Sequence, residues 1–97
     1  ARLSAVKADM FRKELVHNLI SEIRGNGLLL AVELNDSRLI PYIVSHAPDY
    51  GIILDYFLFC DNAFRIAPPL IINEEEISYA CSQLTKLLDD AAKIYEK

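Results

Sequence analysis

Residues 28–34 read LLLAVEL, a near-continuous apolar run that predicts the strand around which the rest of the chain is arranged. Runs of this kind are typical of strands buried on both faces, whereas a half-exposed strand alternates apolar and polar residues. A strand buried in this way needs a covering layer on each face. We therefore expect helices on one side of it and a neighbouring structure on the other.

Before this strand, residues 4–23 are predicted to form a helix, because good helix formers dominate and glycine and proline are absent. The apolar stripe of this helix changes phase near Met10 and Phe11, although a helix on a single core would keep its stripe in phase. We therefore interpret residues 1–22 as a helix that links two bodies. In the alternative, residues 1–9 lie against a symmetry-related copy or fray. Arg24-Gly25-Asn26-Gly27 then breaks the helix in a turn or bulge.

After the apolar strand, Pro41 predicts a short helix that runs to about Ala47. Residues 52–57 and 63–67 are predicted as two further strands, because β-branched and aromatic residues are frequent in the first and the second is a short apolar run. Residues 58–62 are expected to form a loop. Pro68-Pro69 cannot donate backbone hydrogen bonds, so the pair is expected at a sheet edge or beyond it.

The last helix has the clearest pattern. Asn73 is expected to cap it, with Glu76 three residues later in a capping-box arrangement. One apolar face follows at helical spacing and comprises Ile77, Cys81, Leu84, Leu88, Ala91 and Tyr95. The predicted order is α-β-α-β-β-α, an α+β fold with a small three-stranded, mainly antiparallel sheet covered by helices. Residues 23–97 would form this domain.

Size and charge exclude several classes of protein. The 97 residues suffice for a single domain, and 53% of them are hydrophobic. Ten basic against 14 acidic residues give a net charge of −4, so neither nucleic acid nor an anionic membrane surface is an expected partner. No apolar stretch reaches the roughly 20 residues of a membrane span. Cys60 and Cys81 form no metal or redox motif, which indicates reduced thiols and a cytoplasmic protein.

Taken alone, the residues give little catalytic signal. His17 and His46 lack Cys or Asp neighbours at ligand spacing, so we interpret them as surface or hydrogen-bonded residues rather than ligands. Cys81 belongs to the apolar face of the last helix, and Cys60 has no visible histidine partner. The run Glu74-Glu75-Glu76 could bind a metal, but such runs more often favour the positive end of a helix dipole.

Arg65 is the one charged residue in the apolar run 63–67. Charged residues are seldom placed in short apolar strands without a partner, and the planar fork of an arginine suits a carboxylate. Arg65 is therefore the candidate binding residue. On composition alone, the alternative is an edge-strand arginine paired with a surface acid such as Asp55 or Asp61.

Two segments together resemble a known family. Residues 23–34 (IRGNGLLLAVEL) are similar to the "RGxGLMxGxEL" strand of class III aminotransferases, with departures at Leu29 and Ala31, where the family usually has Met and Gly. Residues 64–77 (FRIAPPLIINEEEI) resemble that family's "RxxPPLxIxxEEI" segment. The order and approximate spacing agree with the C-terminal small domain of acetylornithine and ornithine aminotransferases, which are pyridoxal phosphate enzymes of fold type I.

The resemblance implies a function and a set of partners. It implies transfer of an amino group between an amino donor and a 2-oxo acid, with Arg65 binding the substrate carboxylate. In the family, the cofactor lysine, the acid facing the pyridinium nitrogen and the phosphate cup belong to the large domain. None of the chain's lysines matches the cofactor lysine, so we expect no catalytic residue and no cofactor binding in this chain alone.

The missing initiator methionine suits a piece of a longer chain. The resemblance implies that this piece packs on the large domain of the same polypeptide and that the whole enzyme is a homodimer. The alternative is a free-standing α+β module for protein interaction or small-ligand binding.

Overall fold

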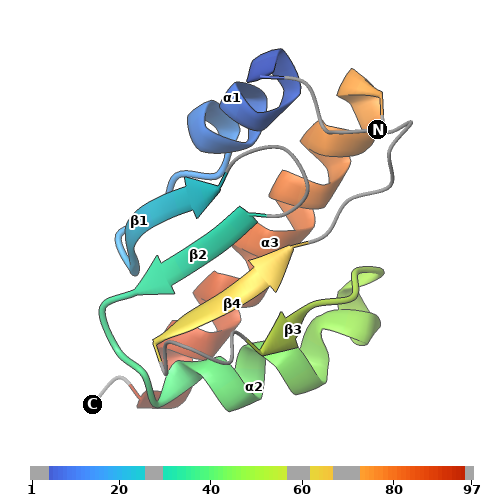
Figure 1. Cartoon of the computed structure of the whole chain (residues 1–97). Helices are drawn as coiled ribbons and strands as arrows, with labels where there is room; N and C mark the ends of the chain where they lie inside the picture. The colour runs from blue at the N-terminus through green and yellow to red at the C-terminus, as the bar shows by residue number, and fades with distance from the viewer. Residues whose placement is uncertain (1–4, 26–29, 57–61, 67–72, 96–97) are drawn as a thin grey trace.

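The structure, a computed structural model, describes residues 5–25, 30–56, 62–66 and 73–95. Along the chain lie α1 (Ala5–Glu14), β1 (Ile20–Gly25), β2 (Leu30–Leu34), α2 (Leu39–His46), the 3-10 helix η1 (Ala47–Tyr50), β3 (Asp55–Tyr56), β4 (Ala63–Ile66) and α3 (Glu74–Tyr95) (Figure 1).

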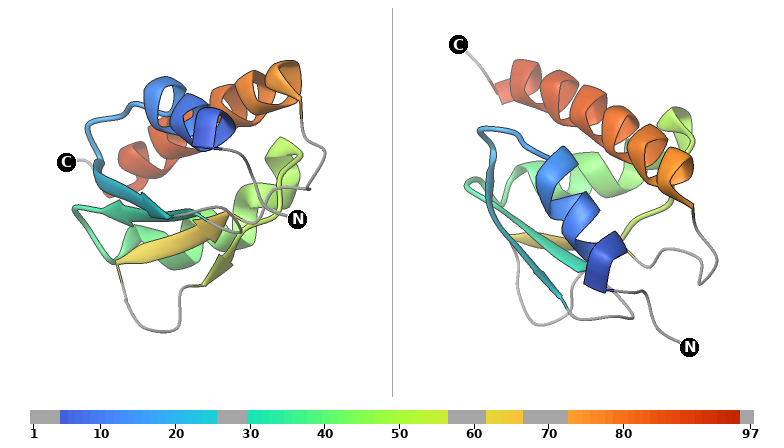
Figure 2. Two further views of the ribbon diagram at one scale, coloured as in Figure 1. Left: turned by 45° about the horizontal axis from the view of Figure 1, so that its top comes forward. Right: turned by 90° about the horizontal axis from the view of Figure 1, so that it is seen from above.

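The strands form one antiparallel sheet in the order β1-β2-β4-β3. The helix α3 crosses one face of this sheet, and α1 and α2 lie on the same side as α3 (Figure 2). No helix in the described part of the chain covers the opposite face, which is called the open face below. The predicted α+β class with an antiparallel sheet and helices is confirmed.

The core lies between the sheet and the helices. On β2, Leu30, Val32 and Leu34 are buried at every second position and face the helices, as the period of a strand requires. Phe64 of β4 packs in the same layer. The helices contribute Ala8, Phe11, Leu39, Ile40, Ile43, Ile77, Cys81, Leu84, Leu87, Leu88 and Ala91. Among the described residues, no polar or charged residue is buried.

The helix predicted over residues 4–23 is wrong beyond Glu14, because residues 20–25 form β1. The sheet therefore has four strands in the described part of the chain, one more than expected. A bulge in β1 explains the error. Ile20 pairs with Leu34 and Ile23 pairs with Val32, so both isoleucines face the core although they are three residues apart. That spacing imitates the period of a helix.

The helix α1 belongs to the same body as the rest of the chain. It packs along α3, and its Phe11 is 1% exposed in the common core. The apolar stripe does not swing around one long helix, because the chain leaves the helix and enters a strand. The helix expected over residues 1–22 is therefore wrong from residue 15 onward, and its role as a link to a second body stays a prediction.

The other elements differ from expectation mainly at their ends. The short helix begins at Leu39, with Pro41 in its first turn, where a proline is tolerated. Only Asp55–Tyr56 of the strand expected over 52–57 pairs in the sheet, and Phe57 lies outside the described residues. The strand expected over 63–67 is confirmed for Ala63–Ile66. Pro68-Pro69 and most of the expected loop 58–62 also lie outside the described residues.

The final helix is confirmed together with its cap. The backbone N–H of Glu76 donates to Asn73 Oδ1 at 2.8 Å, and the backbone N–H of Asn73 donates to Glu76 Oε1 at 2.9 Å. These reciprocal bonds are the capping box that the sequence predicts. Within the described ranges, no helix is both long and apolar enough to span a bilayer.

Candidate functional site

Arg65 lies on the open face of the sheet. Its neighbours in sequence, Phe64 and Ile66, point to the core, so the side chain of Arg65 points to the other side. β4 lies between β2 and β3, so Arg65 is not on the edge strand that composition alone suggested. An arginine in this place keeps its charged head near water while the strand below it is buried.

The partner of Arg65 is Asp55, the residue directly opposite on β3. Arg65 Nη2 donates to Asp55 Oδ2 at 3.2 Å, and the two side chains are 37% and 58% exposed. Asp55 is one of the two acids expected for a structural pair, and Asp61, the other, lies outside the described residues. Exposed pairs of this kind contribute about 0–1 kcal/mol of stability.

A second feature of Arg65 sets it apart from an ordinary surface arginine. Its Nε atom is buried and has no hydrogen-bond partner in the described part of the chain. A buried donor without a partner costs about 1–3 kcal/mol. Asp55 therefore satisfies the guanidinium only in part. A carboxylate that brought two oxygens to the two Nη atoms would use more of its donors, while Nε stays buried.

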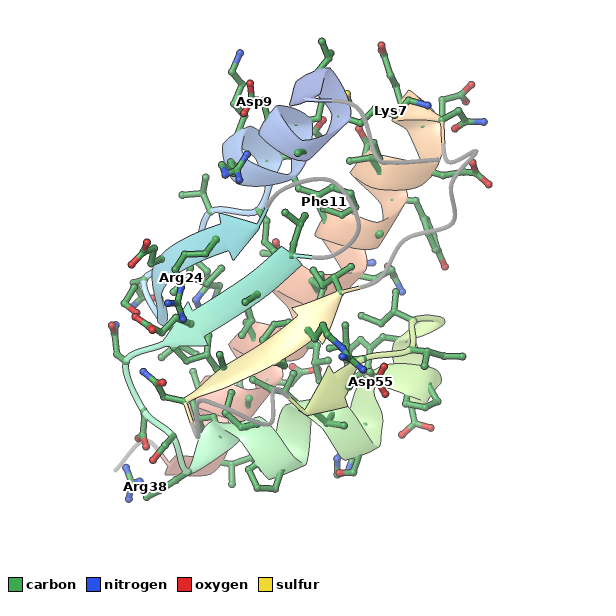
Figure 3. All side chains as sticks on the ribbon, in the orientation of Figure 1. Lys7, Asp9, Phe11, Arg24, Arg38 and Asp55 are labelled. Atoms are coloured by element: carbon green, nitrogen blue, oxygen red, sulfur yellow. The ribbon has the colours of Figure 1, made fainter. Side chains whose placement is uncertain are left out.

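The same face carries a second arginine. Arg24 of β1 and Arg65 of β4 both pair with Ala31 of β2, so the two arginines stand on either side of a small residue. Adjacent strands lie about 4.8 Å apart, which puts the two Cα atoms roughly 10 Å from each other. Arg24 Nη2 donates to Glu33 Oε2 at 3.1 Å. Arg24 and Asp55 both project from the open face, toward its two sides (Figure 3).

Arg12 holds the C-terminal end of β1, the strand that carries Arg24. Its Nη2 donates to the backbone carbonyl of Gly25 at 2.7 Å, and its Nη1 donates to Asp9 Oδ1 at 3.1 Å. Gly25 has a φ of 152°, a value that favours glycine. Arg12 thus ties α1 to the segment that the sequence singled out as a turn. Asn26 and Gly27 of that segment lie outside the described residues.

The two histidines have ordinary partners, as expected. His17 Nε2 lies 2.7 Å from Asp89 Oδ1, and His17 Nδ1 accepts the backbone N–H of Leu19 at 3.1 Å. His46 stacks on Tyr42 with ring centroids 4.1 Å apart. Both nitrogens of His17 are engaged, so this ring is held in one tautomer and links the start of β1 to α3.

Cys81 is a core residue, as its position in the apolar face of α3 predicts. It is 2% exposed, and its burial, with a smaller effect of Glu14, raises the pKa of the thiol to about 12. At neutral pH it is therefore a thiol and not a nucleophilic thiolate. Cys60 lies outside the described residues. Glu74, Glu75 and Glu76 are exposed in the first turn of α3, and the described residues contain no cluster suited to a metal ion.

Pyridoxal phosphate would need a lysine for its Schiff base, an acid at the pyridinium nitrogen and a phosphate cup. The described lysines are Lys7, Lys13, Lys86 and Lys93, all on α1 or α3. One cavity lies between the end of α1 and β1, and another lies between Gly51 and the first turns of α3. Neither is lined by a lysine. The described residues therefore do not by themselves fit this cofactor.

Comparison with known proteins places the chain in a family. Residues 3–88 match the family model described as aminotransferase class-III. The chain belongs to the class III aminotransferase family. The resemblance carried by residues 23–34 and 64–77 is therefore confirmed.

The relatives of this chain are several times longer. Ornithine aminotransferase 2 of Staphylococcus saprophyticus is 33% identical over an alignment of 88 positions, and the match covers 84% of this chain and 20% of the relative. Ornithine aminotransferase of Bacillus cereus is 34% identical over an alignment of 80 positions, and the match covers 78% of this chain and 18% of the relative. The chain thus spans about a fifth of the length of these relatives.

Solved aminotransferases share the fold. The omega transaminase from Pseudomonas jessenii in complex with PMP superposes with a TM-score of 0.77 at 30% identity, over 93% of this chain and 22% of that one. A Bacillus anthracis aminotransferase superposes with a TM-score of 0.73 at 27% identity, over 89% of this chain and 22% of that one. The similarity thus covers nearly the whole of this chain and a limited part of each transaminase.

Sequence reasoning found Arg65 and named Asp55 but missed the row formed with Arg24. The row depends on β1 pairing with β2, whereas the sequence predicts a helix that runs to residue 23 and a turn over residues 24–27. The available signal was Ile20 and Ile23 beside a glycine, which is consistent with a short strand that contains a bulge.

Proposed function

We propose that this chain is the small domain of a pyridoxal-phosphate-dependent aminotransferase that moves an amino group between an amino donor and a 2-oxo acid. In this proposal Arg65 holds the substrate's carboxylate. The cofactor, and the groups that act on it, belong to a large domain of the same polypeptide, so the chain is not catalytically competent alone. Pyridoxal phosphate, when bound there, supplies the electron sink for the transfer.

The state of the Arg65 guanidinium carries the proposal. It is a permanent cation on the open face, its one hydrogen bond in the described structure is 3.2 Å long, and its Nε has no partner. Amino acids and 2-oxo acids both bring a carboxylate, and a bidentate contact with arginine fixes its orientation as well as its position. An arginine committed to a buried network could not offer this.

The first prediction concerns Arg65→Gln in the full-length enzyme. We expect KM for the carboxylate substrate to rise and kcat/KM to fall by about 10²-fold or more, because a charge-assisted contact is lost. Steady-state kinetics with both substrates measures this change.

Arg38→Gln is the matched control. Arg38 also pairs with an aspartate, Asp36, at 2.6 Å, but it lies at the start of α2 and not on the open face. We expect its kinetics to match the unsubstituted enzyme. If Arg65→Gln behaves like Arg38→Gln, Arg65 does not bind the substrate.

The resemblance also implies a homodimer, while the cysteines predict a cytoplasmic location and the negative net charge predicts no nucleic-acid or membrane partner. These stay predictions. The free-standing interaction module is the competing proposal, and the size of the native polypeptide separates the two.

A further inference from the structure

A groove lies between the C-terminal end of α1 and β1, and it is called the α1–β1 groove below. Its volume is about 250 Å³, and its lining residues are Arg12, Leu15, Val16, His17, Ile20 and Ile23. Sites for drug-sized ligands usually measure ~300–1,000 Å³, so this groove suits a smaller molecule. Ile23 faces the core and its neighbour Arg24 projects from the open face, so the groove lies on the opposite side of the sheet from Arg65.

The walls of the α1–β1 groove are mostly apolar. Leu15 is 2% exposed, and Ile20 and Ile23 are partly buried against the core. Val16 is 71% exposed and therefore belongs to the rim. A short hydrocarbon chain laid between these side chains would cover apolar surface that water now touches, which favours binding.

Arg12 supplies a cationic group to this groove, and its guanidinium is held in place. Nη2 donates to the backbone carbonyl of Gly25 at 2.7 Å, so the guanidinium bridges the two walls, α1 and β1. Nη1 donates to Asp9, whose side chain is 64% exposed, at 3.1 Å. Nε has no hydrogen-bond partner in the described part of the chain and, unlike Nε of Arg65, is not buried. A guanidinium has five N–H groups, so Arg12 keeps donors that an anion can reach.

His17, the other polar residue in the lining, has both ring nitrogens engaged. Nε2 lies 2.7 Å from Asp89 Oδ1, and Nδ1 accepts the backbone N–H of Leu19 at 3.1 Å. An anion in the groove would therefore bind to Arg12 and not to His17.

We propose that the α1–β1 groove is a binding site for a free short-chain carboxylate. The hydrocarbon chain lies against Ile20 and Ile23, and the carboxylate accepts hydrogen bonds from the guanidinium of Arg12. Charge complementarity selects this ligand, because an uncharged apolar molecule would leave the donors of Arg12 unused. The inference does not rest on the proposed function, since it uses neither Arg65 nor the cofactor.

NMR spectroscopy of the full-length holoenzyme tests this site. The protein carries Arg65→Gln, so that the arginine of the open face does not contribute to binding of the probe. Hexanoate is titrated while the δ-methyl signals of Ile20 and Ile23 are followed, and we expect both signals to shift to saturation. The Kd of hexanoate should be at least about fivefold lower than that of hexan-1-ol, which lacks the charge, and that of acetate, which lacks the chain.

Two exposed valines give matched variants. Val16→Asp places a negative charge at the rim and should raise the Kd of hexanoate at least about threefold. Val6→Asp makes the same change on α1 outside the groove, at a residue that is 68% exposed, and should leave the Kd unchanged. Arg12→Gln should raise the Kd at least about fivefold, and Arg12→Lys should restore part of the affinity.

The valine variants keep the test independent of the tie between Arg12 and Gly25, which Arg12→Gln removes. Isoleucine signals that do not move with hexanoate would overturn the inference. Hexan-1-ol that binds as tightly as hexanoate, or a Val16→Asp variant that behaves like Val6→Asp, would overturn it as well, because the groove would then not select an anion.

Discussion

Cys81 and Arg65 are both single residues whose surroundings decide what they can do. The Cys81 thiol lies in the core, where loss of water penalises the thiolate and raises its pKa to about 12. The guanidinium of Arg65 reaches the open face, where 37% of its side chain is exposed. The Cys81 thiol is therefore unreactive, whereas Arg65 places a charged group at the surface, although both residues lie in apolar stretches of sequence.

The pKa of Cys81 leads to a test at the residue scale. A thiol reagent at pH 8 should react with folded Cys60→Ser protein, in which Cys81 is the single thiol, at least ~100-fold more slowly than with the same protein in urea. The raised pKa also means that its contribution to stability is full below about pH 9, the ordinary value, and declines as the pH rises toward 12. Equal rates in the folded and unfolded protein would contradict the burial of Cys81.

At the scale of elements, the helix α3 and the strands β2 and β4 could be predicted from the sequence. Their signals are local: a capping box at Asn73, an unbroken helical face, and apolar runs at 30–34 and 63–66. β1 could not be predicted, because its bulge places Ile20 and Ile23 at a helical spacing. Only pairing with β2, a contact between separate segments, gives that segment its conformation. The row of Arg24, Ala31 and Arg65 also depends on the pairing of β1 with β2, so it could not be predicted from the sequence either.

The role of α1 is testable at this scale. Phe11→Ala should lower the free energy of unfolding by about 3–5 kcal/mol, because Phe11 is 1% exposed between α1 and the rest of the core. Urea unfolding of the chain measures the difference. Val6→Ala on the same helix is the control: Val6 is 68% exposed, and its loss should change stability by no more than about 0.5 kcal/mol. Equal effects of the two variants would mean that α1 does not belong to this core.

For the whole molecule, the sheet with helices on one side leaves a face on which charged side chains gather. That face holds the candidate carboxylate site, while the described lysines lie on α1 and α3. The chain corresponds to about a fifth of the length of its relatives. The described residues include a candidate substrate-binding residue but no set of groups that would hold the cofactor. This is expected if substrate binding and cofactor binding belong to different domains.

The mass of the native polypeptide tests this account most directly. An antibody raised against the 97-residue chain would recover the protein from its source cells for mass spectrometry and absorbance spectroscopy. The account predicts a single polypeptide several times heavier than 11.0 kDa that carries the visible absorbance of bound pyridoxal phosphate. A native protein of 11.0 kDa without that absorbance would contradict it and favour the free-standing module.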